Sequence, residues 1–271
     1  MKFNYMLAPL EDITGPALRN ICHKYGADLT FTSMAKIESL AKNNASSLSK
    51  TELKDDTPTV IQIIGAKEGY FAKFLSKFDP PKGFHGFNLN LGCPSPQIIN
   101  IGQGCAMIKR ITKIKKIMQI FKNGGHKTSI KLRLGLNNFE KNKKIYLNLI
   151  EAIDAEFFIV HARHGQETYK QPADLSVYEE CVKTGKNIIA NGDIDSKEKV
   201  DSLKDIGVKG VMIGRAAVRD PGIFNRLKGE DALPKEDIIK EAIELSKKYN
   251  ELSKIQKNLA NKSGALNEKR L

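Results

Sequence analysis

Residues 187–214 read NIIANGDIDSKEKVDSLKDIGVKGVMIG. The apolar runs at 187–190 and 210–213 predict two short strands, and residues 196–206 between them have the spacing of an amphipathic helix. A strand, a helix and a second strand in close succession form the unit from which parallel sheets are built. The number of such units in the chain therefore decides the fold.

The unit repeats along the whole chain. Strands are predicted at 5–9, 29–32, 59–64, 86–90, 128–133, 157–161, 187–190 and 210–213. Helices are predicted between them at 16–25, 67–78, 105–121, 141–153, 196–206 and 215–227. Eight strand–helix units in about 230 residues predict a (β/α)8 TIM barrel, whose usual size is about 250 residues.

A doubly wound parallel sheet is the alternative fold. It would rarely need eight parallel strands, and it prefers a glycine fingerprint after its first strand, where this chain has APLEDITG at 8–15. We therefore predict a TIM barrel over residues 1–230. An amphipathic stretch at 233–259 predicts a short C-terminal helical extension over 231–271.

Length and composition limit the class of protein. The 271 residues are 41% hydrophobic and 28% charged, which allows one sizeable core and excludes a disordered tail, a collagen and a disulfide mini-scaffold. The formal net charge of +13 favours a polyanionic partner. A generally lysine-rich composition without such a partner is the alternative.

The four cysteines, Cys22, Cys93, Cys105 and Cys181, form no CxxC pair or Cys/His cluster. This pattern argues against a zinc site and a disulfide framework, so we expect no metal. No apolar run approaches the roughly 20 residues of a membrane span, and the start, MKFNYMLAPLED, turns acidic before a signal-peptide core could form. The sequence thus predicts a cytoplasmic protein without membrane contact.

The predicted strands end in polar residues. In TIM barrels the working residues lie at the C-terminal ends of the strands. Here those ends carry Pro9, Leu10, Glu11, Gln62, Asn88, Asn90, Cys93, Lys131, Arg133, His161, Arg163, Asn191, Gly192, Asp193, Gly214 and Arg215. An apolar barrel interior does not favour such side chains unless a polar ligand meets them, so we expect a ligand at the barrel mouth.

The ends of the last two strands predict a phosphate site. Barrels commonly bind phosphate with the loops after strands 7 and 8, where this chain has Asn191-Gly192-Asp193 and Gly214-Arg215. Glycine lets backbone N–H groups approach phosphate oxygens, and Arg215 could add a bidentate hydrogen bond. Alternatively, each glycine only makes the turn that ends its strand.

Three basic residues extend this expectation. Lys131 and Arg133 are two positions apart on one strand, so both should face the mouth and meet an anion or a polarised carbonyl. Alternatively, one of them pairs with Asp193 or Glu11. His161 closes an apolar strand, and such a histidine is either a ligand contact or a structural residue.

Cys93 is the strongest candidate for chemistry. It follows a predicted strand and begins a loop that continues through Gly102-Gln103-Gly104. A free cysteine is usually a small buried hydrophobic residue, which fits Cys22, Cys105 and Cys181 better.

The motifs resemble those of one known family. The order APLEDITG, VIQIIG, NLNLGCPSP with GQGCAMIK, IKLRLG, FFIVHARHGQETY, IIANGDI and GVMIGRAAVRDPGIF, over about residues 5–227, is similar to that of the flavin-dependent tRNA-dihydrouridine synthases. The resemblance implies a barrel that holds FMN at its mouth and is reduced by NADPH. It implies addition of two hydrogens across the C5=C6 bond of uridines in tRNA.

The resemblance also assigns roles to residues. It implies flavin contacts by Pro9, Leu10, Glu11, Gln62, Lys131, His161, Asn191, Gly192, Asp193, Gly214 and Arg215, a uridine contact by Asn90, and proton donation to C5 by Cys93. We also expect Arg133 and Arg163 to contact the substrate. Leu10 stands where the family usually has Met, Asn88 where an acidic residue is common, and residues 231–271 where a longer tRNA-binding helical domain is normal.

Two other functions remain open from the sequence. One is an FMN oxidoreductase acting on a free pyrimidine or other small molecule, related to dihydroorotate dehydrogenases. The other is a flavin-holding RNA-binding protein without catalysis. The sequence leaves the modified uridine, the preference for NADPH over NADH and the oligomeric state undetermined.

Overall fold

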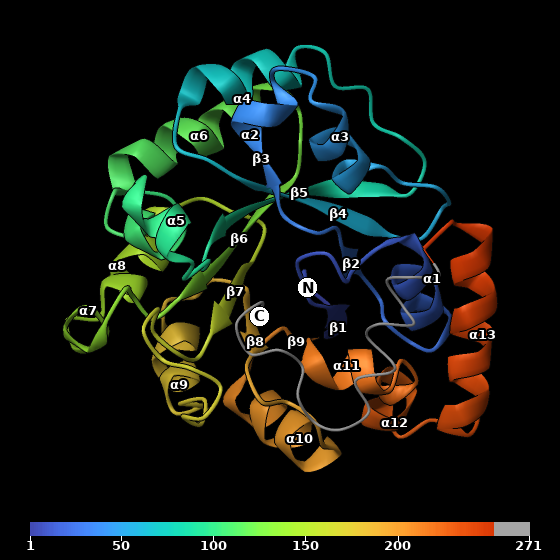
Figure 1. Cartoon of the computed structure of the whole chain (residues 1–271). Helices are drawn as coiled ribbons and strands as arrows, with labels where there is room; N and C mark the ends of the chain where they lie inside the picture. Colours follow the sequence, from blue (N-terminus) through green and yellow to red (C-terminus); the bar gives the residue numbers. More distant parts are fainter. Residues whose placement is uncertain (252–271) are drawn as a thin grey trace.

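A ring of parallel strands surrounded by helices forms the core of the molecule (Figure 1). The computed structural model describes residues 1–251. The strands are β1 Asn4–Leu7, β2 Thr30–Phe31, β3 Ala35–Lys36, β4 Thr59–Ile64, β5 Phe84–Leu91, β6 Thr128–Arg133, β7 Phe158–His161, β8 Ile188–Asn191 and β9 Gly210–Ile213. The order around the sheet is β1-β9-β8-β7-β6-β5-β4-β2, with β3 also beside β4.

Backbone hydrogen bonds between the first strand and the segment entering β2 close the ring. The Leu7 amide donates to the Leu29 carbonyl oxygen at 3.0 Å, and the Asp28 amide donates to the Tyr5 carbonyl oxygen at 2.8 Å. All pairings between strands are parallel. The predicted TIM barrel is therefore confirmed.

The helices cover the outside of the ring (Figure 1). They are α1 Pro16–Lys24, α2 Ile37–Leu40, α3 Ala45–Thr51, α4 Glu68–Leu75, α5 Pro96–Asn100, the 3-10 helix η1 Gly104–Met107, α6 Ile111–Asn123, α7 Asn138–Asn142, α8 Ile145–Ala152, α9 Val177–Lys183, α10 Lys197–Ile206, α11 Arg215–Arg219, α12 Ile223–Lys228 and α13 Lys235–Lys248. Parallel strands require such crossovers because each strand must start at the same end of the barrel.

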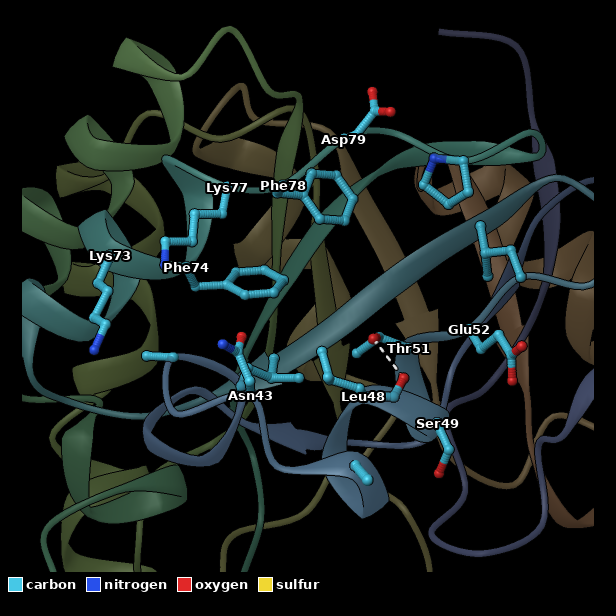
Figure 2. Close-up of a pocket in the computed structure, with 15 residues that line it drawn as sticks. Asn43, Leu48, Ser49, Thr51, Glu52, Lys73, Phe74, Lys77, Phe78 and Asp79 are labelled. Carbon is cyan, nitrogen blue, oxygen red and sulfur yellow. Dashed lines mark hydrogen bonds between the residues drawn. The ribbon is translucent and has the colours of Figure 1, made fainter.

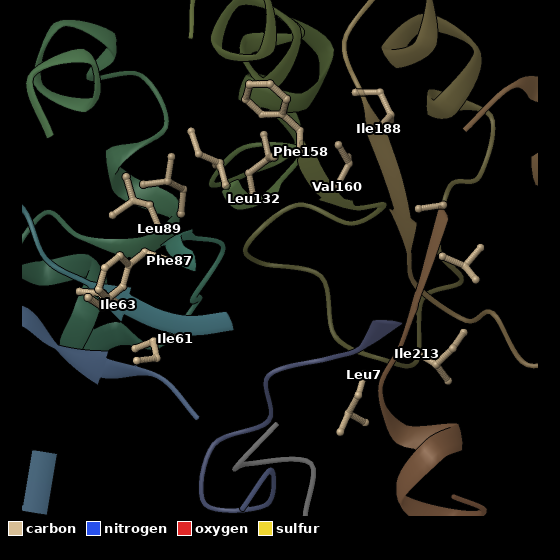
Figure 3. Close-up of a cluster of buried hydrophobic side chains, with 14 of the residues drawn as sticks. Leu7, Ile61, Ile63, Phe87, Leu89, Leu132, Phe158, Val160, Ile188 and Ile213 are labelled. Carbon is tan, nitrogen blue, oxygen red and sulfur yellow. The ribbon is translucent and has the colours of Figure 1, made fainter. Parts of the chain in front are cut away.

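The alternation of side chains along the strands produces two apolar layers. One set packs between strands and helices, among them Leu7, Ile61, Phe158 and Ile213 (Figure 3). The residues next to these in sequence form a second, separate cluster of Met6, Ala8, Phe31, Val60, Ile159, Ile189 and Met212. Because neighbouring residues of a strand face opposite sides, this second cluster fills the inside of the ring.

The inward face changes from apolar to polar toward the C-terminal ends of the strands. Val60 is followed two residues later by Gln62, Ile159 by His161, and Ile189 by Asn191. Gln62, His161 and Asn191 have at most 8% of their surface exposed. The strand period of two thus places the polar strand ends in one layer at the mouth.

Three segments that were each predicted as one continuous helix are interrupted in the structure, so these predictions were wrong in this respect. The predicted helix 105–121 divides into η1 and α6. The predicted helix 141–153 is interrupted at Lys144, whose φ is 51°, and the predicted helix 215–227 is interrupted at residues 220–222. Pro221 explains the last break, because proline lacks the N–H that a continuing helix would use.

The predicted C-terminal helix is present as α13, which ends at Lys248, and residues 252–259 of the predicted stretch lie outside the described residues. This helix packs along α1. The Tyr25 hydroxyl donates to Glu241 at 3.0 Å, and the Glu251 carboxylate accepts from the Ala17 amide at 3.0 Å. The division of the chain at residue 230 stays a prediction.

A substitution at Gly210 tests the close packing of β1 against β9. A Cβ there would lie 2.4 Å from the Asn4 carbonyl oxygen and 3.1 Å from Ile189 Cδ1. Since backbone must move to relieve the contact, Gly210→Ala should lower the free energy of unfolding by about 1–3 kcal/mol in urea titrations. The matched control is Gly69→Ala, where a Cβ meets nothing within 4 Å. Equal stability of the two variants would contradict this packing.

Candidate active site at the barrel mouth

A side-chain hydrogen bond that passes over β7 connects β6 to β8. Lys131 Nζ donates to Asn191 Oδ1 at 2.9 Å. Asn191 is itself fixed, because its side-chain amide donates to the Met212 carbonyl oxygen and its backbone N–H donates to the Tyr178 hydroxyl, at 2.9 and 2.8 Å. The lysine ammonium is therefore held at a defined point inside the mouth.

The environment of Lys131 disfavours its charged form. Burial, together with the positive charge of the neighbouring Arg133 guanidinium, lowers the pKa of Lys131 to about 7. Burial and Arg133 likewise hold the pKa of His161 well below its usual range. Both groups thus favour an incoming anion, because an anion would stabilise their protonated forms.

Amide side chains on β4 and β5 form a chain of hydrogen bonds beside the lysine. Gln62 Nε2 donates to Asn88 Oδ1 at 2.8 Å, and Asn90 Nδ2 donates to Gln62 Oε1 at 2.9 Å. Asn88 also donates to the Ser129 hydroxyl at 2.9 Å. An acidic residue at 88 could not donate to Ser129, so this asparagine has a role that the sequence did not reveal.

Asn90 also shapes the loop that presents Cys93. Its Oδ1 accepts from the backbone amides of Gly92 and Cys93 at 3.0 and 2.9 Å. Gly104, with a φ of 58°, packs where a Cβ would lie 2.4 Å from the Cys93 carbonyl oxygen. Glycine is therefore required at 104, and the two ends of the loop are fixed against each other.

The four cysteines differ in exposure, as predicted. Cys93 is partly exposed, whereas Cys22, Cys105 and Cys181 are buried. Burial raises the pKa of the Cys93 thiol, so the thiol is protonated at neutral pH. Cys105 is close by, since its amide donates to the Cys93 carbonyl oxygen at 3.1 Å.

Asp193, which follows β8, forms ion pairs with two arginines, one after β7 and one after β9. It has a φ of 51° and pairs with the Arg163 and Arg215 guanidinium groups, the latter at 2.8 Å. Burial alone would raise the pKa of Asp193, but the hydrogen bonds from Arg163 and the Ala173 amide, together with the charges of both arginines, outweigh burial and lower the pKa. Arg215 also stacks on Tyr169, with 3.7 Å between the guanidinium carbon and the ring centroid.

The structure separates the roles of the basic residues. Arg163 is 1% exposed and enclosed by Asp193 and the Gln171 carbonyl oxygen, so it holds the loop and presents no surface to a ligand. Arg133 is 4% exposed and donates to the His164 and Glu167 carbonyl oxygens at 2.9 and 3.3 Å. Within the described residues, neither Lys131 nor Arg133 pairs with Asp193 or Glu11.

The loop after β1 brings Glu11 and Leu10 to the same rim. Glu11 Oε1 pairs with Lys50 of α3, which places this helix at the mouth. Its other oxygen, Oε2, is buried without a hydrogen-bond partner among the described residues. An unsatisfied buried acceptor at this point fits a site whose ligand supplies a donor.

Gly192 and Gly214 close the predicted phosphate loops. Gly192 has a φ of 123°, and a Cβ there would lie 3.0 Å from Ala173 Cβ. A Cβ on Gly214 would make only ordinary contacts with Ala8 and Leu10, at 3.6 and 3.7 Å. Backbone conformation therefore requires glycine at 192, whereas the space at 214 would admit a side chain.

The candidate site thus assembles residues from β1, β4, β5, β6, β7, β8 and β9 and the loops after them. The sequence did not identify two of the supporting residues, Tyr178 and Lys50. Tyr178 lies on a helix rather than at a strand end, and Lys50 is one of many lysines in a polar connection. No local pattern distinguishes such residues.

A separate pocket of about 620 Å³ lies outside the barrel between α3, α4 and the connection to β5 (Figure 2). Leu48, Phe74 and Phe78 form its apolar wall, with Lys73 and Lys77 at the edge. None of the predicted site residues lines it. It is therefore distinct from the mouth.

Residues 1–251 contain no group of three His, Cys, Asp or Glu side chains that could hold a metal ion. Within the same residues, no helix is long and apolar enough to span a membrane.

Comparison with protein-family models matches residues 6–268 to the family described as dihydrouridine synthase (Dus). The chain belongs to the dihydrouridine synthase family. The resemblance predicted from the motifs is therefore confirmed at the level of the family, and membership supports an oxidoreductase.

Three relatives in the dihydrouridine synthase family each match more than four fifths of this chain. A probable tRNA-dihydrouridine synthase of Helicobacter pylori is 31% identical, covering 87% of this chain and 74% of the relative. A probable tRNA-dihydrouridine synthase 2 of Bacillus subtilis is 29% identical over 89% and 75%. The tRNA-dihydrouridine synthase B of Pseudomonas putida is 28% identical over 84% and 68%.

Solved structures support the fold of this family member. Morphinone reductase in complex with tetrahydroNAD superimposes with a TM-score of 0.57 and 11% identity, covering 86% of this chain and 88% of that chain. At this identity, the similarity concerns the barrel alone.

Lys131→Met should remove a pH-dependent contribution to stability. The pKa of Lys131 is about 7 in the folded protein and about 10.4 in an unfolded chain. Between these values the unfolded state binds more protons, so the free energy of unfolding of the wild type rises with pH relative to the variant. The rise is at most about 1.4 kcal/mol per pH unit.

Urea unfolding of the ligand-free proteins from about pH 6 to about pH 10 measures this difference. The exposed Lys115→Met is the matched control, and its difference from the wild type should be independent of pH over this window. A difference for Lys131→Met that is equally flat would contradict the buried position of the ammonium.

Proposed function

We propose that this protein is a tRNA-dihydrouridine synthase that uses FMN and NADPH to reduce the C5=C6 bond of uridine, with Cys93 as the proton donor to C5. The observation that carries the proposal is the joint presentation of Cys93 and Asn90 at the rim of a polar barrel mouth in a dihydrouridine synthase family member.

The residues of the mouth fit a flavin phosphate ester. Lys131 would lie against the ring system and stabilise its negative charge after reduction, which agrees with the partly neutral amine inside the site. Gln62 would hydrogen-bond the ring edge, and Pro9, Leu10, Glu11 and His161 would complete the ring contacts. Asn191, Gly192, Asp193, Gly214 and Arg215 would form or orient the phosphate end.

When bound, the flavin supplies a hydride for C6 of uracil. Addition at C6 leaves negative charge over C5 and the C4 carbonyl group, so C5 must receive a proton. Cys93 serves this role because its raised pKa keeps the proton on sulfur at neutral pH. Asn90 hydrogen-bonds the Cys93 amide and thereby fixes the donor beside the uridine contact.

A structured tRNA requires additional binding energy. A stacked uridine must be extruded to reach the mouth, which costs a few kcal/mol. The net charge of +13 supports contacts with the RNA backbone that offset this cost. The charge also favours tRNA over a free pyrimidine as the substrate.

Cys93→Ala should retain bound FMN and its reduction by NADPH, while reduction of uridine in tRNA falls by about 10²- to 10⁴-fold because the general acid is lost. The measurement combines flavin absorbance at rest, its bleaching by NADPH and its tRNA-dependent recovery. The released cofactor is identified by mass.

Cys181→Ala, which removes a buried thiol on α9, is the control and should keep wild-type turnover. Full tRNA-dependent turnover in Cys93→Ala would rule out the proton-donor role. Turnover of the wild type on free pyrimidines, with none on tRNA, would replace the proposed substrate.

A further inference from the structure

Phe139 is the most exposed large hydrophobic side chain in the described part of the chain. Its surface is 68% exposed, compared with 58% for Ile101 and 48% for Leu233. It lies on α7, which follows β6 and projects at the outer edge of the ring (Figure 1). Single exposed hydrophobic residues are common, so the surroundings of Phe139 must decide whether it has a role.

Two side-chain hydrogen bonds fix the start of the short helix α7. Asn137 Oδ1 accepts from the Glu140 amide at 3.0 Å, and Glu140 Oε2 accepts from the Leu136 amide at 2.7 Å. Asn137 thus caps the helix, and the Glu140 side chain reaches back to the residue before this cap. Glu140 is only 9% exposed and also pairs with Lys109 at 3.2 Å. Phe139 is therefore displayed from an ordered turn.

This turn belongs to the rim of the candidate active site. Backbone hydrogen bonds join it to the loop after β7, from Gly165 to the Gly135 carbonyl oxygen at 2.8 Å and from Gln166 to that of Leu136 at 3.1 Å. Arg133, at the end of β6, donates to carbonyl oxygens of the same loop. The loops after β6 and β7 thus form one wall at the C-terminal end of the barrel.

A cation accompanies the exposed ring. Lys143 Nζ lies 5.8 Å from the Phe139 ring centroid. The neighbouring Lys141 and Lys144 pair with Asp174 and Glu180, whereas Lys143 has no ion-pair partner within residues 1–251. Proteins bind single-stranded nucleic acids with exposed aromatic rings beside cationic side chains. A base stacks on the ring, and a phosphate contacts the cation.

We propose that Phe139 stacks on an unpaired base of the RNA substrate while Lys143 contacts an adjacent phosphate, so that this wall of the mouth positions the RNA. The inference rests on the proposed function, since it assigns a substrate contact to that same site. The basic charge of the chain favours RNA over a protein partner for this edge.

The test compares four variants of the full-length, flavin-loaded protein with wild type: Phe139→Ala, Phe139→Leu, Phe139→Trp and Lys143→Ser. The readouts are the Kd for unmodified tRNA, kcat and KM for dihydrouridine formation, and the rate of flavin bleaching by NADPH. Leu233→Ala is the matched control. It removes an exposed apolar side chain from the connection between α12 and α13.

Loss of stacking should raise Kd and KM by about 5- to 100-fold in Phe139→Ala. Phe139→Leu should be nearly as weak, Phe139→Trp should match or exceed wild type, and flavin bleaching should be unchanged in all. Lys143→Ser should reduce the salt dependence of binding by about one phosphate contact. Leu233→Ala should bind as wild type does.

Wild-type Kd and KM in Phe139→Ala, with the wild type active on tRNA, would overturn this inference and leave the proposed function standing. Full binding by Phe139→Leu would also overturn it, because an aliphatic side chain cannot replace a stacked ring. A wild type that neither binds nor reduces tRNA would instead refute the proposed function.

Discussion

The hydrogen bond from Lys131 to Asn191 is the contact on which the arrangement of the mouth depends. Burial makes a charged lysine inside a barrel costly, and the amine of Lys131 is held in place here by a fixed amide oxygen. Asn191 is fixed by Met212 and Tyr178, and the chain then turns at Gly192 into Asp193. The same residue that satisfies the lysine therefore starts the loop proposed to hold phosphate.

The opposite wall depends on a second amide. Asn90 links Gln62, on the inside of the barrel, to the backbone of Cys93 at the rim. One side chain thus connects the region proposed for the flavin ring with the proposed proton donor. This connection gives a physical reason for the close spacing of the asparagine and the cysteine in the sequence.

The sequence predicted the barrel well because its signals are local and repeated. Several strands combine an apolar run with an inward residue that is polar at the C-terminal end, as in Ile159 to His161 and Ile189 to Asn191. Helix continuity was harder to predict, because the break at Lys144 depends on a single positive φ angle.

The candidate site was predictable only in part. Position on a strand indicated Lys131 and Asn191, but their contact over β7 and the lowered pKa of the lysine arise from the folded barrel. Arg163 was expected at the substrate, whereas the structure encloses it against Asp193. Tyr178, on a helix outside the ring, had no sequence signal because only folding brings its hydroxyl to Asn191.

Nucleoside mass spectrometry of bulk tRNA tests the central claim most directly. The tRNA would come from a strain that lacks this gene and any second synthase gene, with and without re-expression of the wild-type chain or Cys93→Ala. The account predicts that dihydrouridine is lost and that only the wild type restores it. Unchanged dihydrouridine in the deletion strain, or restoration by Cys93→Ala equal to that by the wild type, would contradict it.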